Sequence, residues 1–319
     1  MFYESAGTIY KELQLPCGFG RIKDFATAME YDIIHKEART MVIDFHTHTF
    51  PQSVAERAIA AIQEKGRSVA FTDGTRQGLL ASMAGSGVQL SVVLPVATNP
   101  AKLASMNAVS IENNGDNGML YFGAMHPLAE NWKEQLQTLA DAGIRGIKIH
   151  PLYQGVDITD KRYLRILQAC GELDLIVVMH AGDDIAYPGQ VRCSPKMTAQ
   201  ALRQVGPVKM VLAHMGGWKN WEEVTEYIGP TGAYVDTALS LGKITPLPDA
   251  TWQEEQLQLL DADRFCDMVR QLGSRRVLFG TDSPWGDPKQ DLERIYALPL
   301  EPWEKEQMLC QNARRLLNI

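Results

Sequence analysis

The sequence predicts an α/β fold, a single-domain (β/α)8 barrel of the TIM type, and two observations support this prediction. Short apolar runs, typical of buried strands, alternate with amphipathic stretches, typical of helices, along most of the 319 residues. Strands that are apolar along their whole length indicate parallel pairing with both faces covered by helices. Because eight such runs are present, closure into a barrel is favoured over an open, doubly wound sheet, which is the alternative.

Each predicted element follows from its own pattern of apolar residues. The spacing of Leu164, Leu167 and Gly171, for example, is that of a helix face that packs on a sheet. The predicted strands are 41–43, 88–96, 119–125, 144–149, 175–179, 208–213, 233–235 and 277–280. The predicted helices are 54–65, 101–113, 132–142, 163–173, 199–205, 221–228 and 257–272.

The predicted barrel domain covers residues 41–319 and follows an extension of residues 1–40. Phe25, Met29 and Ile33 share one face of a helix predicted over 22–39, which would pack on the barrel's rim or bottom. The alternative is that Met41 is the natural start. The long connections 182–195 and 239–253 both follow strands, so we expect them to roof the active face and set substrate choice.

Composition and charge exclude several classes of partner. The net charge is −7 and no cluster of lysine or arginine offsets it, which argues against nucleic-acid binding. No apolar run approaches the roughly 18 residues of a membrane span, and we expect no secretory signal, because the N-terminus lacks a basic region followed by an apolar core. The five cysteines are scattered without a Cys-x-x-Cys pair, as expected of free thiols in the cytoplasm. The expected partner is a small-molecule substrate; a homodimer is compatible with the fold.

Polar residues that bind metals stand at the ends of the predicted strands. His46 and His48 end the first strand, and alternation with period two turns both imidazoles to one face. His180, His214 and Asp282 end later strands. Since the carboxyl ends of barrel strands open on one face, these side chains converge there. Several imidazoles and one carboxylate form a ligand set suited to Zn²⁺ or a similar divalent metal.

The motifs around these residues resemble the amidohydrolase superfamily. The resemblance rests on IDFHTH at 43–48, GIKIHP at 146–151, HAG at 180–182, AHMGG at 213–217 and GTDSPW at 280–285, with NARRL at 312–316 similar to the closing helix. It is strongest to the amidohydrolase-related group, which contains metal-dependent hydrolases and enzymes similar to aminocarboxymuconate-semialdehyde decarboxylase. The resemblance extends from about residue 41 to the C-terminus and is specific for the family, not for a substrate.

The resemblance implies a role for each of these residues. His46, His48 and His180 would bind the metal, most simply one Zn²⁺, as neutral imidazoles. Asp282 would be a further ligand, or would take the proton of the bound water. His214 would be a proton shuttle in a mononuclear site or a ligand in a binuclear one. Asp282 and His214 are then the catalytic base and acid.

Other site residues are predicted with less specific roles. Lys148 would bridge two metals as a carboxylated lysine if the site were binuclear; otherwise it would form an ion pair in the barrel mouth. His150 lies on the same strand face as Lys148 and, with Arg192 in the loop after the fifth strand, is a candidate for substrate binding. Asp44 would orient a metal-bound imidazole or form a hydrogen bond in the barrel core.

Three functions are compatible with this set of residues. The first is a metal-dependent hydrolase of an amide, lactone or ester-like bond in a small molecule, in which metal-activated water attacks the carbonyl. The second is non-oxidative decarboxylation of a small carboxylic acid on the same metal site. The third is a non-catalytic metal-binding protein, which the presence of every expected ligand and base disfavours.

Overall fold

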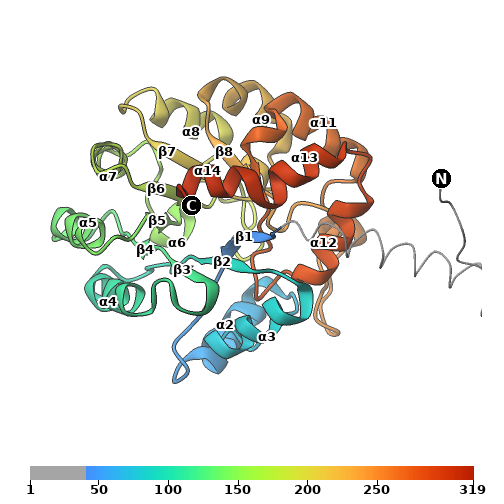
Figure 1. Cartoon of the computed structure of the whole chain (residues 1–319), viewed down its shortest axis with the longest axis horizontal. Helices are drawn as coiled ribbons and strands as arrows, with labels where there is room; N and C mark the ends of the chain where they lie inside the picture. Colours follow the sequence, from blue (N-terminus) through green and yellow to red (C-terminus); the bar gives the residue numbers. More distant parts are fainter. Residues whose placement is uncertain (1–40) are drawn as a thin grey trace, which may run out of the picture. The chain divides into compact units, whose positions relative to one another are not determined.

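A computed structural model describes residues 41–319, which contain nine strands and a surrounding layer of helices (Figure 1). The predicted extension 1–40 and its helix 22–39 lie outside the described residues. The strands are β1 (Ile43–Thr47), β2 (Leu90–Val93), β3 (Met119–Tyr121), β4 (Gly123–Ala124), β5 (Gly146–Ile149), β6 (Ile176–Met179), β7 (Lys209–Leu212), β8 (Tyr234–Asp236) and β9 (Val277–Leu278). All neighbouring strands pair in parallel.

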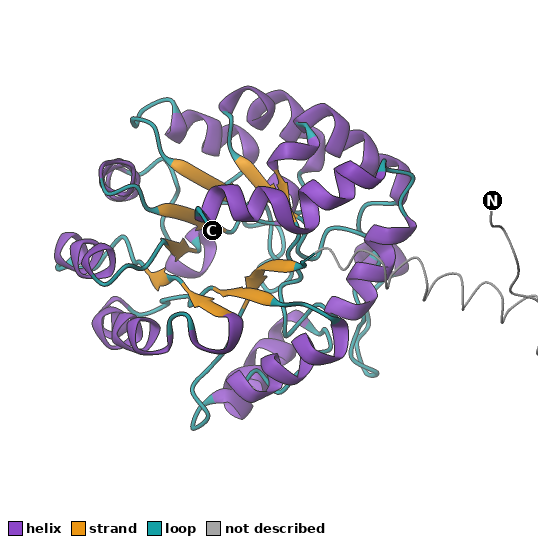
Figure 2. Ribbon diagram, in the orientation of Figure 1, coloured by secondary structure: helices purple, strands orange, loops and turns teal. Residues whose placement is uncertain are grey.

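The strands form a closed ring, which confirms the predicted barrel (Figure 2). Phe122 alone separates β3 from β4; β3 pairs with β2 and β4 pairs with β5, so one interrupted strand joins the two parts of the sheet. On the opposite side, Phe45 N donates to Phe279 O over 2.8 Å, and Thr47 and Ser283 form a parallel bridge. The end of the last strand therefore pairs with the first strand, and eight strand positions close the ring.

Helices follow the strands and cover the outside of the ring (Figure 2). They are α2 (Ala55–Gly66), α3 (Arg76–Ser86), α4 (Leu103–Asn113), α5 (Trp132–Asp141), α6 (Pro151–Gln154), α7 (Lys161–Glu172), α8 (Pro195–Leu202), α9 (Trp221–Ile228), α10 (Glu254–Leu257), α11 (Ala262–Leu272), α12 (Pro288–Ala297), α13 (Pro302–Glu306) and α14 (Asn312–Leu317). No helix within 41–319 is long and apolar enough to cross a lipid bilayer.

Helix α7 illustrates how local sequence sets an element. The side chain of Asp160 accepts a hydrogen bond from Arg162 N and caps the first turn. Tyr163, Ile166 and Cys170 then recur at the spacing of one helix face and are buried against the sheet. Burying each such side chain stabilises the fold by roughly 1.5–3 kcal/mol, which far exceeds the intrinsic helix propensity of the segment.

Helices α3 and α12 were not predicted, nor were the short helices α6, α10 and α13, and one predicted helix begins later than expected. Helix α3 contains Gly78 and Gly85 and has little amphipathic pattern, while α12 begins at Pro288, directly after turn-forming residues. The predicted helix 257–272 was wrong in its first turn, because the chain leaves α10 at Leu257 and Asp261 caps a separate helix, α11.

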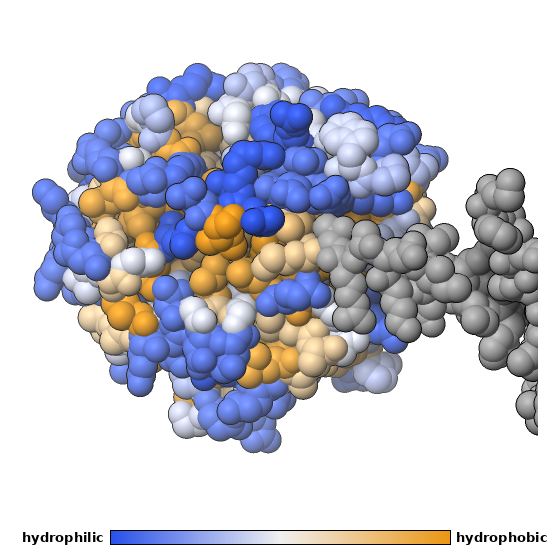
Figure 3. Space-filling model, in the orientation of Figure 1, coloured by the Kyte–Doolittle hydropathy of each residue, from blue (hydrophilic) through white to orange (hydrophobic). Residues whose placement is uncertain are grey.

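The barrel's two ends differ in their packing. A cluster of buried residues joins Ile43 and Ile176, which begin β1 and β6, with Leu316 and Leu317 of α14. Helix α14 therefore covers the end of the ring where the strands begin (Figure 1). In the same view, hydrophilic residues dominate the rim, and hydrophobic residues gather towards the middle of the face (Figure 3). The polar residues of the predicted site lie at the opposite end of the ring, where the strands finish.

Candidate metal centre

The predicted site residues lie at the carboxyl ends of their strands. His46 is in β1, Lys148 is in β5, and His180 and His214 follow β6 and β7 directly or after one residue. Each of these side chains is buried, with an exposed fraction of 5% or less. Asp282 follows β9 by four residues and completes the group. Their convergence agrees with the geometry expected of a barrel.

Three of the predicted metal ligands form one compact group, named here the β1–β9 cluster: His46, His48 and Asp282. His46 Nε2 lies 3.2 Å from His48 Nε2 and 3.2 Å from Asp282 Oδ1. His48 Nε2 lies 2.9 Å from the same carboxylate oxygen. Two ligands of a tetrahedral zinc ion with bonds of ~2.05 Å stand about 3.3 Å apart. The three atoms thus have the spacing of ligands that share one ion.

Hydrogen bonds on the far side of each ring fix which nitrogen can bind a metal. His46 Nδ1 lies 2.9 Å from Asp236 Oδ2, and His48 Nδ1 lies 2.6 Å from Leu94 O. Because both partners accept, each Nδ1 carries the proton and each neutral ring has its lone pair on Nε2. Two lone pairs facing each other over 3.2 Å repel unless a cation lies between them. The donor set therefore fits a divalent metal.

Burial and neighbouring charges favour the metal-binding forms of these groups. Burial, together with the charge of Lys148, holds the pKa of His46 well below its ordinary value, so this imidazole stays neutral. Burial alone would raise the pKa of Asp282, but the imidazoles of His46 and His48 hold it well below the usual range. The cluster thus combines the neutral imidazole of His46 with an ionised carboxylate.

The backbone is shaped to bring β9 against β1 at this point. A Cβ atom on Gly280 would lie 2.8 Å from His46 Cβ, so only glycine allows this approach. Asp282 itself has a φ of 63°, and His214 has a φ of 60°. A left-handed backbone is unfavourable for residues other than glycine and clusters at functional sites. These two residues are also the predicted catalytic pair.

Asp236, at the end of β8, is a functional residue that the sequence reasoning missed. It is fully buried and accepts hydrogen bonds from His46 Nδ1, His214 N and Ala238 N. Burial raises its pKa. Its carboxylate orients His46, the role considered for Asp44, which instead accepts hydrogen bonds from Thr281. The signal was a polar residue directly after the predicted strand 233–235.

Lys148 lies directly beside the cluster. Its Nζ is 3.0 Å from His46 Nε2. The ion pair considered for it is not formed, because no carboxylate oxygen of residues 41–319 lies within 4.0 Å of Nζ. Burial lowers the pKa of Lys148 to about 8, which increases the fraction of neutral amine. Carboxylation of a lysine requires that neutral form, so the position remains compatible with a bridging ligand.

Two further histidines and an aspartate form a second group, named here the β5–β6 cluster: His150, His180 and Asp184. His150 Nε2 lies 3.5 Å from Asp184 Oδ2, and its Nδ1 accepts from Tyr153 N. His180 Nε2 lies 2.8 Å from the Asp183 carbonyl oxygen. The two rings stack with centroids 4.0 Å apart, and burial lowers the pKa of both. Here each Nε2 faces oxygen acceptors and carries a proton.

His214 connects the two clusters. Its Nδ1 lies 2.8 Å from Ala238 O and its Nε2 lies 3.1 Å from His180 Nδ1, while its ring centroid is 5.3 Å from that of His46. The imidazole of His214 therefore lies between the β1–β9 cluster and His180, the fourth predicted ligand. Its role as a ligand stays a prediction.

Arg192 and Cys193 lie in the loop after β6, and Trp285 lies in the segment between β9 and α12. Arg192 forms an ion pair with Asp157 over 2.8 Å, half-exposed, and its role in substrate binding stays a prediction. Cys193 is buried, its thiol donates to His180 O, and burial raises its pKa, which suits a structural thiol. Trp285 lies edge-on to His48, with ring centroids 6.1 Å apart.

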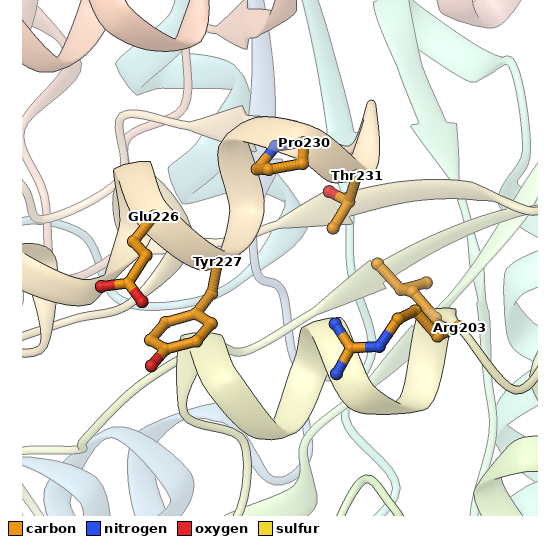
Figure 4. Close-up of a pocket in the computed structure, with 6 residues that line it drawn as sticks. Arg203, Glu226, Tyr227, Pro230 and Thr231 are labelled. Carbon is orange, nitrogen blue, oxygen red and sulfur yellow. The ribbon is translucent and has the colours of Figure 1, made fainter.

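A hollow on the outer helices lies away from this centre. Arg203, Glu226 and Tyr227 line it, at the carboxyl ends of α8 and α9 (Figure 4). Those helix ends lead into the beginnings of β7 and β8, so the hollow lies on the face opposite the histidines. In barrels that face contributes stability and not catalysis.

Comparison with known proteins agrees with this geometry. A family model described as Amidohydrolase matches residues 43–319. The chain belongs to the amidohydrolase family. The resemblance inferred from the motifs is thereby confirmed, and with it membership of a superfamily of enzymes. No curated protein sequence matches this amidohydrolase.

Solved structures share its fold at low identity. An uncharacterised TIM-barrel protein from Bordetella bronchiseptica is 20% identical, with a TM-score of 0.64 over 87% of this chain and 98% of that chain. 5-Carboxyvanillate decarboxylase from Sphingomonas paucimobilis is 13% identical, with a TM-score of 0.63 over 88% of this chain and 99% of that chain. A probable 2-pyrone-4,6-dicarboxylic acid hydrolase from Acinetobacter baumannii is 14% identical, with a TM-score of 0.56 over 87% of this chain and 99% of that chain. A related 5-carboxyvanillate decarboxylase structure contains manganese.

Proposed function

We propose that this amidohydrolase is a metal-dependent hydrolase that cleaves an amide, lactone or ester-like bond of a small molecule. One observation carries the proposal: the lone pairs of His46 Nε2 and His48 Nε2 face each other over 3.2 Å, with the ionised Asp282 within 3.2 Å of both. A divalent metal bound there would polarise a carbonyl and acidify water. The imidazole donors favour Zn²⁺, and manganese is the alternative.

The residues around the metal position divide the proton transfers between them. Asp282, which is ionised beside His46 and His48, is the base that takes the proton of the attacking water. His214 Nε2, 3.1 Å from His180 Nδ1, would receive this proton and pass it on to the leaving group. Asp236 holds His46 in the tautomer that leaves Nε2 free.

Decarboxylation on the same residues is the second candidate. Lys148 favours it, because a buried ammonium group 3.0 Å from His46 Nε2, without a carboxylate partner within 4.0 Å among residues 41–319, would attract a substrate carboxylate. Several proteins of similar fold are named as decarboxylases. A non-catalytic metal-binding role is the third candidate, supported by the metal ligands alone.

The experiment separates these candidates in one protein preparation. We would measure metal content, then assay a panel of esters, lactones and amides beside a panel of aromatic acids labelled with ¹³C at the carboxylate. We expect about one zinc per chain and hydrolysis that is lost on chelation and restored by zinc. Labelled CO₂ without hydrolysis would replace the proposal with a decarboxylase, and metal without turnover on either panel would favour the non-catalytic role.

The number of metal ions per chain also tests whether Lys148 is a bridging ligand. Two metals per chain, with a mass increase of one CO₂ under native conditions, would make Lys148 a carboxylated bridging ligand. One metal and an unmodified mass would keep the site mononuclear. Neither result depends on knowing the substrate.

A further inference from the structure

The connection between β1 and β2 contains a segment that a simple βα unit does not need. Helix α3 is the helix that returns to the start of the next strand, since Gln89 N, just after it, donates to Val42 O at the beginning of β1. The residues between β1 and α3, including α2, are therefore an addition at the end of the ring where the strands finish. Their two ends are joined, because Phe50 N donates to Gly74 O over 2.8 Å. We name residues 50–74 the β1 excursion.

The far end of this excursion, residues 65–71, is named here the strap, and it pairs with the loop after β8. Ser68 and Pro246 form an antiparallel bridge. Two backbone hydrogen bonds of 2.9 Å flank this bridge, from Val69 N to Thr245 O and from Leu247 N to Arg67 O. A pair of short strands is only marginally stable by itself in water, so this contact can open without unfolding the barrel.

Side chains add little to the pairing of the strap with this loop. Trp252 Nε1 donates to Arg67 O over 3.3 Å, and Arg67 Nη2 forms an ion pair with Asp249 Oδ2 over 2.7 Å. The Asp249 side chain is 75% exposed, and an exposed ion pair contributes little to stability. The apolar side chains of the strap all lie outside the buried core. Segments with few buried apolar contacts are the ones that open locally in folded proteins.

The strap also contacts the loops that follow β9 and β6. Phe71 N donates over 2.7 Å to the carbonyl oxygen of Pro284, two residues after Asp282. A Cβ atom on Gly66 would lie 3.3 Å from Ile185 Cγ2, in the loop after β6. In the order of the ring β6 is the fifth of eight strand positions, so it lies opposite β1. Because segments that begin on opposite sides of the ring meet here, their contact crosses the mouth of the barrel.

The predicted metal ligands are correspondingly closed off from solvent. The exposed fraction of the side chain is 1% for His46, 12% for His48 and 14% for Asp282. A small molecule that reaches these groups needs a wider opening than this arrangement provides. In many enzymes the movement of a loop over the active site provides such an opening.

We propose that the strap is a lid over the metal centre, and that separation of Ser68 from Pro246 opens it to small molecules. The joined ends of the β1 excursion, Phe50 and Gly74, form the base on which the strap moves. That the admitted molecules are substrate and product rests on the proposed function; that the strap controls access to the metal does not.

A disulfide that holds the lid closed tests this proposal. In an antiparallel pair flanked by hydrogen bonds in this way, facing Cα atoms lie about 4.5 Å apart, within the roughly 4.4–6.8 Å that a disulfide spans. The variant is therefore Ser68→Cys with Pro246→Cys, loaded with zinc. We would measure the rate at which excess chelator removes zinc from the oxidised and the reduced forms. We expect removal from the oxidised form to be at least about tenfold slower, and removal from the reduced form to match the wild-type protein.

Each single variant, treated with the same oxidant, is the matched control. The four cysteines of residues 41–319 are buried, so oxidation should not slow the removal of zinc from either control. Equal rates for the oxidised and reduced double variant would overturn the lid. Two cysteines that fail to oxidise in the zinc-loaded protein would contradict the closed position of the strap.

Amide hydrogen exchange tests the same opening without zinc and without new cysteines. Trp252→Phe keeps an aromatic ring but removes the hydrogen bond to Arg67 O. We expect the amides of Val69 and Leu247 to exchange about fivefold faster in this variant, with the Phe50 amide unchanged. Exchange of Val69 and Leu247 at the wild-type rate would overturn the proposed opening. Because neither measurement needs turnover, failure of the hydrolase proposal would leave both results interpretable.

Discussion

The two histidine clusters contain the same residue types, yet hydrogen-bond direction gives them different chemistry. In the β1–β9 cluster, His46 and His48 each donate from Nδ1 to an oxygen, so neither neutral ring has a second proton for Nε2, where the two rings face each other and Asp282. In the β5–β6 cluster, the Nε2 atoms of His150 and His180 face oxygen acceptors instead. Proximity alone would make both clusters metal sites. The tautomers that the surroundings impose select the first.

The largest difference between the clusters should appear in turnover. Asp282→Asn removes the ionised base next to His48 and should lower kcat about 10³-fold or more, while the protein stays folded. The matched change in the other cluster is Asp184→Asn, which should cost less than about tenfold. Steady-state kinetics with circular dichroism on both variants checks this. Equal losses would mean that the clusters act as one unit.

Metal affinity should show the next largest difference. His48→Ala removes a ligand whose Nε2 faces His46 Nε2 and Asp282 Oδ1, and zinc affinity should fall by more than about 100-fold. His150→Ala removes a ring whose Nε2 faces Asp184 and should leave affinity within about threefold. Competition with a chelator of known affinity gives both values. Full occupancy in His48→Ala would remove that residue from the ligand set.

Asp236→Asn tests the orientation of the first cluster without removing a ligand. An amide can present its NH₂ group to His46 Nδ1 and so favour the wrong tautomer. Zinc affinity should fall by about 10–100-fold, between the values for His48→Ala and His150→Ala. Affinity equal to that of the wild-type protein would show that the tautomer is set elsewhere.

The smallest effect concerns Asp291, a partly buried carboxylate of neither cluster. Burial raises its pKa to about 7, above the ordinary 3.8, so between these values the folded state binds more protons than the unfolded state. Stability from this group is therefore present below about pH 4 and is lost as the pH rises towards 7. Asp291→Asn should make the decline in unfolding free energy between pH 5 and 7 shallower, by on the order of 1 kcal/mol. Urea unfolding at both pH values measures it, and an unchanged decline would contradict the assignment.

The sequence predicts the barrel and its polar rim well because both depend on local patterns. Apolar runs locate the strands within a few residues, and the residue after a run marks the catalytic face, as with His180 after Met179. Asp236 could have been found by the same rule, because it directly follows the strand predicted over 233–235.

Partnerships between distant residues could not be predicted. That Asp236 and not Asp44 orients His46 depends on which carboxylate the closed ring brings to Nδ1. That His180 Nε2 binds a carbonyl oxygen depends on the path of the loop after β6. Helix α3 was not predicted for a different reason. Tertiary packing of Leu79 and Met83 outweighs the low helix propensity of its two glycines.

The pairing of the last strand with the first has a consequence for synthesis on the ribosome. Asp282 follows His48 by 234 residues, so at 5–20 residues per second roughly 10–50 s pass between the two. During that time a nascent chain holds two closely spaced imidazoles without their carboxylate. The order of translation thus delays assembly of the complete β1–β9 cluster until the last strand has been synthesised and the ring can close.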